Sequence, residues 1–346
     1  MSRNPLASII TPVFNQRPYI EQTILSVLKQ GYQNWEWIII DDGSTDGTAN
    51  IIRTFKDSRI KYTHQEHLGV TCLAQTFNKA LDLCKGDLIA FLDSDDYWPA
   101  YKLDVQVRSF DDPDVILSYG KCCVVNHRGR KIGYIDIPPD KKIALNNPVG
   151  SALKRFMYVM KYPLMQPSTV MVKRGSLLNI GGFDVASGVP WDITAWVKLS
   201  LEGRFSSIPS CLGFWRRHRL STNLLRNQEE LFDACTHYLK QFMMQHSKRL
   251  DELGFHFDMS DIEKRWEAIK KEFMTYLPYN RALLMLSLTS FKDAQTEFKR
   301  FLDVHPSIKN RIIYYVIIAS GIIRYDLVGT LLDFREKARS ILSAQK

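Results

Sequence analysis

Two hydrophobic periods alternate along the first hundred residues. Short apolar, β-branched runs such as Ala7–Phe14 and Trp35–Ile40 predict buried strands. Segments whose apolar residues recur every three or four positions, such as Tyr19–Gln30, predict helices between them. The alternation continues with predicted strands at 59–64 and 87–93 and predicted helices at 45–55 and 71–84. This order predicts βαβ units, and hence a Rossmann-like α/β fold with a mostly parallel sheet and helices on both faces.

The pattern changes twice further along the chain. After Pro99 it predicts strands at 115–125, 129–137 and 205–214, a strand and helix within 167–183, and helices at 151–161 and 191–203. From residue 227 to residue 342 helical periodicity dominates. We therefore predict a first domain at residues 1–226, with halves at 1–100 and 101–226, and a mainly helical C-terminal domain at residues 227–346.

The composition is that of a globular protein. Of the 346 residues, 45% are hydrophobic and 24% are charged. The six cysteines form no C-x-x-C pair, which is typical of a protein in a reducing compartment. We expect no signal peptide, because the N-terminus lacks a charged segment followed by an apolar one. The apolar run Ile312–Ile323 is too short to span a bilayer and predicts a buried helix, with contact to a membrane surface as the weaker interpretation.

The net charge and the absence of two nucleotide-binding motifs limit the classes of ligand that the chain is expected to bind. The formal net charge is +9, and most of this excess lies in the C-terminal third. A merely solvated basic surface fits this excess, and so does attraction to phosphates on a substrate or on an anionic membrane face. The first predicted strand is followed by "TPVFNQRPY", which is neither a G-x-G-x-x-G fingerprint nor a P-loop. The sequence therefore excludes a dinucleotide cradled by glycines.

Acidic residues end two of the predicted strands. Asp41 and Asp42 follow one apolar run, and Asp93 and Asp95 follow another. In a parallel sheet, ligands bind where the carboxyl ends of the strands meet. The first pair can accept hydrogen bonds from a base or a ribose, or can belong to a turn that caps the next helix. The second pair can bridge a divalent cation to substrate phosphates, or can be an ordinary acidic turn.

Five blocks of the chain, in this order and spacing, resemble the family 2 glycosyltransferases. They are "IITPVFNQ" (Ile9–Gln16), "DDGSTDGT" (Asp41–Thr48), Gly69 with "NKA" (Asn78–Ala80) and "KGDLIAFLDSDDYWP" (Lys85–Pro99), "GGFD" (Gly181–Asp184) and "WDITAWVKLSLEG" (Trp191–Gly203). The resemblance covers about residues 5–222. It implies a GT-A fold, followed here by the helical C-terminal region.

The resemblance also assigns a donor site. It implies that Asp42, assisted by Asp41, holds the base of a nucleotide-sugar, and that Asp95 and Asp93 form a D-x-D motif binding Mn²⁺ or Mg²⁺. Asp96 is expected to be structural. The residues expected to bind the nucleotide-sugar are Pro12, Phe14, Asn15, Asp41, Asp42, Asp93, Ser94 and Arg217.

A further carboxylate begins the helix predicted after Pro190. Asp192 in that first turn can cap the helix, or can act as a general base that takes a proton from an acceptor hydroxyl. The resemblance favours the base, because Asp192 matches the second acid of the family's Glu-Asp pair. Trp191 stands in place of the first acid, and we predict that its indole stacks on the acceptor sugar.

The basic segment "WRRHRLSTN" (Trp215–Asn223) resembles the family's loop over the diphosphate, although a basic surface loop has the same composition. Within it, His218 is expected to complete the metal shell. His67 departs from the asparagine usual at its position. A metal pair of His64 and His67 is the weaker hypothesis there, because no carboxylate partner is evident.

The sequence thus predicts a metal-dependent, inverting glycosyltransferase. It would move a sugar from a nucleotide-diphosphate donor to a glycan or lipid-linked acceptor in cell-surface polysaccharide or glycolipid synthesis. A UDP-sugar is the favoured donor. Without a Q-x-x-R-W block, a single transfer is favoured over polymer synthesis. No nucleic-acid partner is expected, the protein would be cytoplasmic or peripheral to the inner membrane face, and the C-terminal helices could form oligomers. The alternatives are a catalytically inactive binding or scaffold protein and a sugar-1-phosphate nucleotidylyltransferase, which "TPVFNQRPY" does not favour.

Overall fold

The computed structural model describes residues 4–135, 148–159, 165–218, 221, 227–287 and 290–323. The chain divides into two compact units. The first contains Met1–Cys123, Tyr134–Trp215 and Glu230–Glu263, and the second contains Val124–Gly133, Arg216–Glu229 and Lys264–Lys346. The domain boundary that the sequence predicts at residue 226 stays a prediction.

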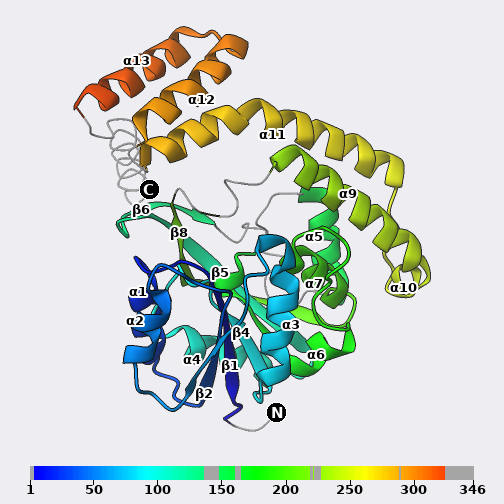
Figure 1. The fold of residues 1–346 in the computed structure, drawn as a ribbon. Coiled ribbons are helices and arrows are strands. Elements are labelled where there is room, and N and C mark those ends of the chain that lie inside the picture. The colour runs from blue at the N-terminus through cyan, green and yellow to red at the C-terminus, as the bar shows by residue number, and fades with distance from the viewer. Residues whose placement is uncertain are drawn as a thin grey trace, which may run out of the picture. The chain divides into compact units, whose positions relative to one another are not determined.

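The described part of the chain contains one eight-stranded sheet (Figure 1). Its strand order is β3-β2-β1-β4-β7-β5-β6, and β8 also pairs with β5. The strands β1 to β4 are parallel to their neighbours in this group, whereas β7 runs antiparallel to β4 and to β5. The strands are β1 (Ala7–Val13), β2 (Trp35–Asp41), β3 (Ile60–His64), β4 (Leu88–Phe91), β5 (Val115–Asn126), β6 (Lys131–Ile135), β7 (Met171–Lys173) and β8 (Arg204–Arg217).

Helices cover both faces of the parallel strands. On one face, Ile20, Ile24 and Val27 of α1 share a buried core with alternate residues of β1, β2 and β4. On the other face, Phe91 of β4 lies 5.9 Å between ring centroids from Phe77 of α3. The helices of the first half are α1 (Ile20–Leu28), α2 (Thr48–Thr54), α3 (Leu73–Leu83) and α4 (Lys102–Val107), with 3₁₀ turns at Val70–Cys72 and Arg108–Asp111. The predicted α/β fold, with helices on both faces of the sheet, is confirmed.

Because helices cover both faces of the sheet, the central strands are apolar at consecutive positions. Every residue of β2 is buried, because β1 and β3 flank it and helices lie on both faces. Four buried polar side chains of β1 and β2 pair with one another. Trp37 Nε1 donates to Thr11 Oγ1 at 2.9 Å, and Ser8 Oγ donates to Glu36 Oε1 at 2.6 Å.

The later helices follow the predicted pattern. They are α5 (Ser151–Val159), α6 (Arg174–Asn179), α7 (Trp191–Leu199), α9 (Gln228–Gln245), α10 (Ser247–Glu252), α11 (Met259–Ser287), α12 (Phe291–Val304) and α13 (Ile308–Ile323), with a 3₁₀ turn at Pro167–Thr169. The mainly helical C-terminal region is confirmed as far as residue 323. The helical pattern predicted beyond it, and the ends of the predicted segments 129–137 and 151–161, lie outside the described residues.

The second unit has a small core of its own between α11, α12 and α13, which includes Phe298, Phe301 and Ile317. The prediction of a buried helix at 312–323 is correct for one side only. Ile317 is fully buried, whereas Ile312 and Tyr315 are 59% and 67% exposed. Among the described residues, no helix has the length and apolar character needed to cross a membrane.

Candidate active site

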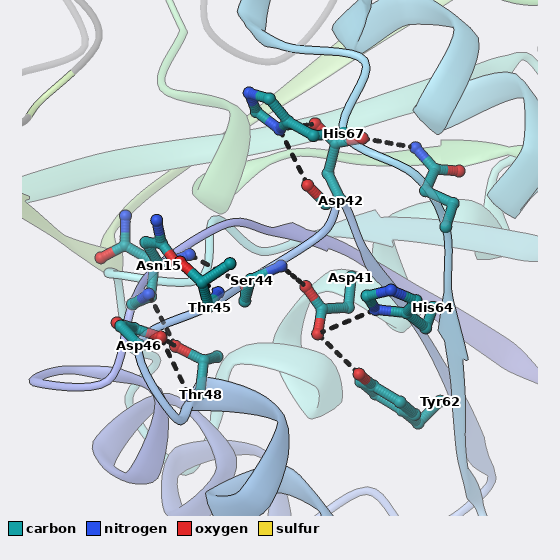
Figure 2. Close-up of polar contacts among 12 residues, drawn as sticks. Asn15, Asp41, Asp42, Ser44, Thr45, Asp46, Thr48, Tyr62, His64 and His67 are labelled. Atoms are coloured by element: carbon teal, nitrogen blue, oxygen red, sulfur yellow. Dashed lines mark hydrogen bonds and ion pairs between the residues drawn. The ribbon is translucent and has the colours of Figure 1, made fainter.

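Side-chain hydrogen bonds join the loops that follow β1 and β2 (Figure 2). The backbone N–H of Asn15 donates to Ser44 Oγ at 2.9 Å, and Asn15 Oδ1 accepts from the N–H of Thr45 at 2.8 Å. Asn15 adopts a left-handed backbone conformation, with φ of 50°, which asparagine tolerates better than most residues. These hydrogen bonds hold the two loops together at one edge of the sheet, at the carboxyl ends of β1 and β2.

Asp46 extends this edge towards α2. Its Oδ1 accepts from the N–H of Thr48, in the first turn of the helix, and its Oδ2 accepts from the N–H of Arg17, both at 2.9 Å. Thr48 Oγ1 in turn accepts from the N–H of Gln16 at 2.8 Å. The "DDGSTDGT" block is thus held to the end of β1 at successive positions.

Asp41 is fully buried and faces β3. It accepts hydrogen bonds from Tyr62 Oη at 2.6 Å and from the N–H of Ser44 at 2.9 Å, and His64 Nδ1 lies 3.7 Å away. Burial and the Asp41 carboxylate together raise the pKa of Tyr62 to about 12. Asp41 thus holds β2 to β3, and its predicted contact with a nucleotide stays a prediction.

Asp42 anchors the segment that follows β3. Its Oδ1 accepts from Gln65 Nε2 at 2.7 Å and from the N–H of Leu68 at 2.9 Å, and its Oδ2 accepts from the N–H of Gly69 at 3.0 Å. Burial alone would raise the pKa of Asp42, but these hydrogen bonds outweigh it and hold the pKa below its ordinary value. Gly69 has φ of 82°, a conformation that glycine adopts without strain.

His67 connects Asp42 with the end of β1. Its ring stacks on Phe14 with a centroid distance of 3.9 Å and an interplanar angle of 21°. Its Nδ1 lies 2.8 Å from the carbonyl oxygen of Asp42 and 2.9 Å from Oδ2 of the same residue. Phe14, Asp42 and His67 therefore come together, whereas His64 turns to Asp41 instead (Figure 2).

The D-x-D block brings its acids close to Asp192. Burial, followed by the charges of Asp95 and of Asp192, raises the pKa of Asp93 to about 8. Burial is the largest cause, and the two carboxylates add to it because a nearby like charge disfavours the ionised form. Three acids from two separate blocks thus share one neighbourhood in the first unit.

Asp96 and Ser94 of this block make contacts that hold the fold. Asp96 is fully buried, and its Oδ2 accepts from Ser168 Oγ at 2.5 Å. Ser94 is buried, and its carbonyl oxygen accepts from Thr23 Oγ1 at 3.0 Å. The expected role of Ser94 at the nucleotide, like that of Pro12, stays a prediction.

The helix α7 begins directly after Pro190, and Asp192 lies in its first turn with 3% exposure. Trp191 beside it is packed among aromatic rings, at 3.9 Å from Phe77 and 5.1 Å from Phe183 between centroids. With 8% exposure, this indole offers little face to a sugar. Trp191 is thus a core residue that fixes the start of α7, and its predicted contact with the acceptor stays a prediction.

Arg217 and His218 fall in the second unit. Burial lowers the pKa of Arg217 to about 10, and the backbone N–H of His218 donates to Ser221 Oγ at 3.0 Å. Of the remaining basic segment beyond His218, only Ser221 is among the described residues. The diphosphate contact of Arg217 and the metal contact of His218 stay predictions.

The donor set at Asp93 and Asp95 suits a hard cation. Within the described residues, no group of three or more His, Cys, Asp or Glu side chains forms a metal site. Mg²⁺ and Mn²⁺ commonly take only one or two protein carboxylates and complete their shell with water and substrate phosphates. Asp93, whose pKa is raised by burial and by the charge of Asp95, fits such a partial site together with Asp95.

Sequence reasoning missed the partners that position these acids. Tyr62, Gln65 and Ser168 belong to none of the blocks, and they reach Asp41, Asp42 and Asp96 only through tertiary packing. His67 was visible as an unusual residue, but neither its stacking on Phe14 nor its contact with Asp42 has a signature in the sequence.

The mixed sheet, with helices on both faces and acids at the ends of its parallel strands, defines an α/β protein. The chain belongs to glycosyl transferase family 2, whose family model matches residues 8–179. The Escherichia coli protein WfgD, a UDP-Glc:alpha-D-GlcNAc-diphosphoundecaprenol beta-1,3-glucosyltransferase, is 41% identical over 122 residues, which is 35% of this chain and 47% of WfgD. Bacillus subtilis TuaG, to which a part in teichuronic acid biosynthesis is attributed, is 47% identical over 106 residues, 30% of this chain and 41% of TuaG. The chain thus spans less than half the length of these relatives.

Solved structures of Staphylococcus aureus TarS 1-349 share the fold over nearly the whole chain. The complex with UDP has a TM-score of 0.54 at 17% identity and covers 96% of this chain and 91% of TarS 1-349. The complex with UDP-GlcNAc has a TM-score of 0.56 at 17% identity and covers 96% and 92%. At this identity the likeness concerns the fold alone, and it confirms the predicted GT-A architecture.

Proposed function

We propose that this protein is a metal-dependent, inverting glycosyltransferase that transfers a sugar from a UDP-sugar to a glycan or lipid-linked acceptor. The observation that carries the proposal is the effect of Asp95 and Asp192 on the pKa of Asp93. This effect supports Asp192 as a candidate base near a candidate metal site at Asp93 and Asp95, and this transfer needs both.

Asp192 acts as the base in this proposal. The first turn of a helix favours a negative charge, and the burial of Asp192 shields its carboxylate from water. The carboxylate removes the proton from an acceptor hydroxyl, and the acceptor oxygen attacks the anomeric carbon of the donor. The bond from that carbon to the diphosphate breaks, and UDP leaves from the opposite side. One displacement without a covalent intermediate inverts the configuration.

Asp95 and Asp93 would hold the cation. A bound Mn²⁺ or Mg²⁺ would supply positive charge to the departing diphosphate. The chain's own contribution is to position the nucleotide at the edge formed by Phe14, Asn15 and Asp42.

The substrates are inferred from relatives. WfgD is named for a UDP-glucose donor and a diphosphoundecaprenol-linked acceptor, and TarS has been solved with UDP and with UDP-GlcNAc. A lipid-linked acceptor would bring this protein to the cytoplasmic face of a membrane, where its net charge of +9 favours anionic lipids. A role in cell-surface polysaccharide synthesis follows from the same relatives.

A release assay for UDP tests the proposal. With UDP-glucose or UDP-GlcNAc, Mn²⁺ and a diphosphoundecaprenol-linked sugar, the wild type should release UDP and form an inverted linkage. Asp192→Asn should lower turnover by roughly 10²- to 10⁴-fold while donor affinity is kept. Glu202→Gln, an exposed acid after the same helix, is the matched control.

Two results would overturn parts of this proposal. Unchanged turnover of Asp192→Asn would remove Asp192 as the base. Binding of UDP-sugars by a wild type that neither transfers nor hydrolyses them would instead support the inactive binding or scaffold protein.

A further inference from the structure

A single buried hydroxyl joins the two ends of the turn that carries the D-x-D acids. Ser168 Oγ accepts a hydrogen bond from the backbone N–H of Asp93 at 3.1 Å and donates one to Asp96 Oδ2 at 2.5 Å. The turn itself is closed by the N–H of Asp96, which donates to the carbonyl oxygen of Asp93 at 3.0 Å. A hydroxyl has one hydrogen and two lone pairs, so Ser168 can serve both residues at once. The first and the last residue of the turn are thereby fixed to the same oxygen atom.

The residues of this turn alternate in burial. Ser94 and Asp96 are buried, whereas Asp93 and Asp95 are only half-buried. The buried pair is held from the inside, because Thr23 Oγ1 lies 3.0 Å from the carbonyl oxygen of Ser94 and 2.7 Å from that of Asp96. The two acids proposed to bind the cation are thus the less buried members of the turn. Their positions depend on how its buried members are held.

Ser168 is itself held in place by the segment that follows the D-x-D turn. It is fully buried in the 3₁₀ turn Pro167–Thr169, directly before β7, and β7 pairs with β4. The carbonyl oxygen of Ser168 accepts from Trp98 Nε1 at 2.7 Å, and that of Thr169 accepts from Gln106 Nε2 at 2.9 Å. The hydroxyl therefore has a fixed position beside the end of β4, from which it can set the geometry of the acids that follow this strand.

We propose that Ser168 is a positioning residue for the metal site, and that its hydroxyl holds the D-x-D turn in the conformation in which Asp93 and Asp95 bind one cation together. The inference deepens the proposed function and rests on it. Two neighbouring carboxylates repel each other, so a turn without this restraint would let them move apart. Groups that orient metal ligands without touching the metal commonly change metal affinity by about 10- to 100-fold.

Calorimetry of UDP binding to the full chain, with and without Mn²⁺, tests this role. Ser168→Ala removes the hydroxyl, so the gain in UDP affinity that Mn²⁺ provides should fall by about tenfold or more. The affinity for UDP without Mn²⁺ should stay close to that of the wild type. Ser168→Cys keeps nearly the same side-chain volume but forms weaker hydrogen bonds, so it should lose part of the gain without leaving a cavity.

Thr169→Val is the matched control, because it also removes a fully buried hydroxyl of the same turn. Thr169 Oγ1 donates at 2.8 Å to the carbonyl oxygen of Gln166, three residues earlier, instead of to the D-x-D turn. Both Ser168→Ala and Thr169→Val should lower the melting temperature, but only Ser168→Ala should lower the gain from Mn²⁺. Equal losses of this gain in the two variants would show that Ser168 serves the fold only.

Hydrogen exchange provides a measurement that needs neither metal nor nucleotide. In the metal-free wild type, the N–H of Asp93 is bonded to a buried oxygen and should exchange slowly. In Ser168→Ala the same N–H should exchange about tenfold faster or more, whereas in Thr169→Val its rate should stay close to that of the wild type.

A full gain from Mn²⁺ in Ser168→Ala would overturn the inference, and so would an unchanged exchange rate of the Asp93 N–H. Failure of the proposed function looks different, since Mn²⁺ would then leave UDP binding unchanged in the wild type itself.

Discussion

Asn78 and Phe183 hold each other by a reciprocal pair of hydrogen bonds. Asn78 Nδ2 donates to the carbonyl oxygen of Phe183, and the N–H of Phe183 donates to Asn78 Oδ1, both at 2.8 Å. Gly182 beside them has φ of 73°, and a Cβ there would lie 2.6 Å from Asn78 Oδ1. The pair ties α3 to the turn that precedes α7, and thereby helps to place Asp192.

Asn78→Ala should therefore destabilise the first unit. The substitution leaves the buried N–H and carbonyl groups of Phe183 without Asn78, which costs about 1–3 kcal/mol. Chemical denaturation followed by tryptophan fluorescence measures this loss. Asp82→Ala, an exposed position on the same helix, should change the free energy of unfolding little. Equal effects of the two variants would contradict the role given to Asn78.

Asp95→Ala should remove metal-dependent nucleotide binding. The substitution leaves one acid of the D-x-D pair, so UDP affinity in the presence of Mn²⁺ should fall about tenfold or more. Calorimetry with and without Mn²⁺ provides the measurement, and Asp111→Ala, an exposed acid of the same unit, provides the control. If Mn²⁺ strengthens UDP binding equally in Asp95→Ala and the wild type, Asp95 is not the metal ligand.

The metal-free protein should lose stability as the pH rises towards 8. The pKa of Asp93 is about 8 in the fold, against an ordinary value of 3.8. Between these values the folded state binds more protons than the unfolded state, so the free energy of unfolding falls as the pH rises. Melting temperatures from pH 5 to pH 8.5 should show a decline on the order of 5 °C that is absent in Asp93→Asn. Parallel pH curves for the two proteins would refute this.

Cys123 and Cys211 should form a disulfide on mild oxidation. Their Sγ atoms, from the neighbouring strands β5 and β8, lie 2.9 Å apart, whereas a disulfide bond is about 2.05 Å long. The partly exposed Cys211 thiolate would attack a small disulfide such as oxidised glutathione and release one thiol. Cys123 would then attack Cys211 Sγ and release the second thiol.

Peptide mapping measures this cross-link, and thiol titration should find four free thiols in place of the six cysteines now free. The Cys72→Ser variant should still cross-link, and Cys211→Ser should not. If Cys211 stays in a mixed disulfide with glutathione and no bond to Cys123 forms, the predicted cross-link is wrong.

The fold was predictable because its signals are local. The runs at Ala7–Val13 and Trp35–Asp41 reveal strands covered on both faces, and Asp41 and Asp42 mark the carboxyl end of the second strand. The division of roles among those acids was not predictable. Asp41 and Asp42 are neighbours in the sequence, yet one faces Tyr62 on β3 and the other holds the segment after β3 (Figure 2).

Trp191 is a second residue whose role could not be predicted from the sequence. As an aromatic residue in place of an expected acid, it suggested a contact with a sugar. Only the packing shows that Phe77 and Phe183 lie against its indole. Which surface of a ring is covered depends on elements far away in the chain, and no short window of sequence contains that information.

The left-handed conformation of Asn15 has a consequence for anyone who recombines this protein with its relatives. Its N–H and its side-chain oxygen are both committed to the loop after β2, through Ser44 and Thr45. A chimera that takes β1 from one parent and β2 from another would separate these partners and leave a strained backbone without its support. Residues 15, 44 and 45 should therefore be exchanged as a single cassette.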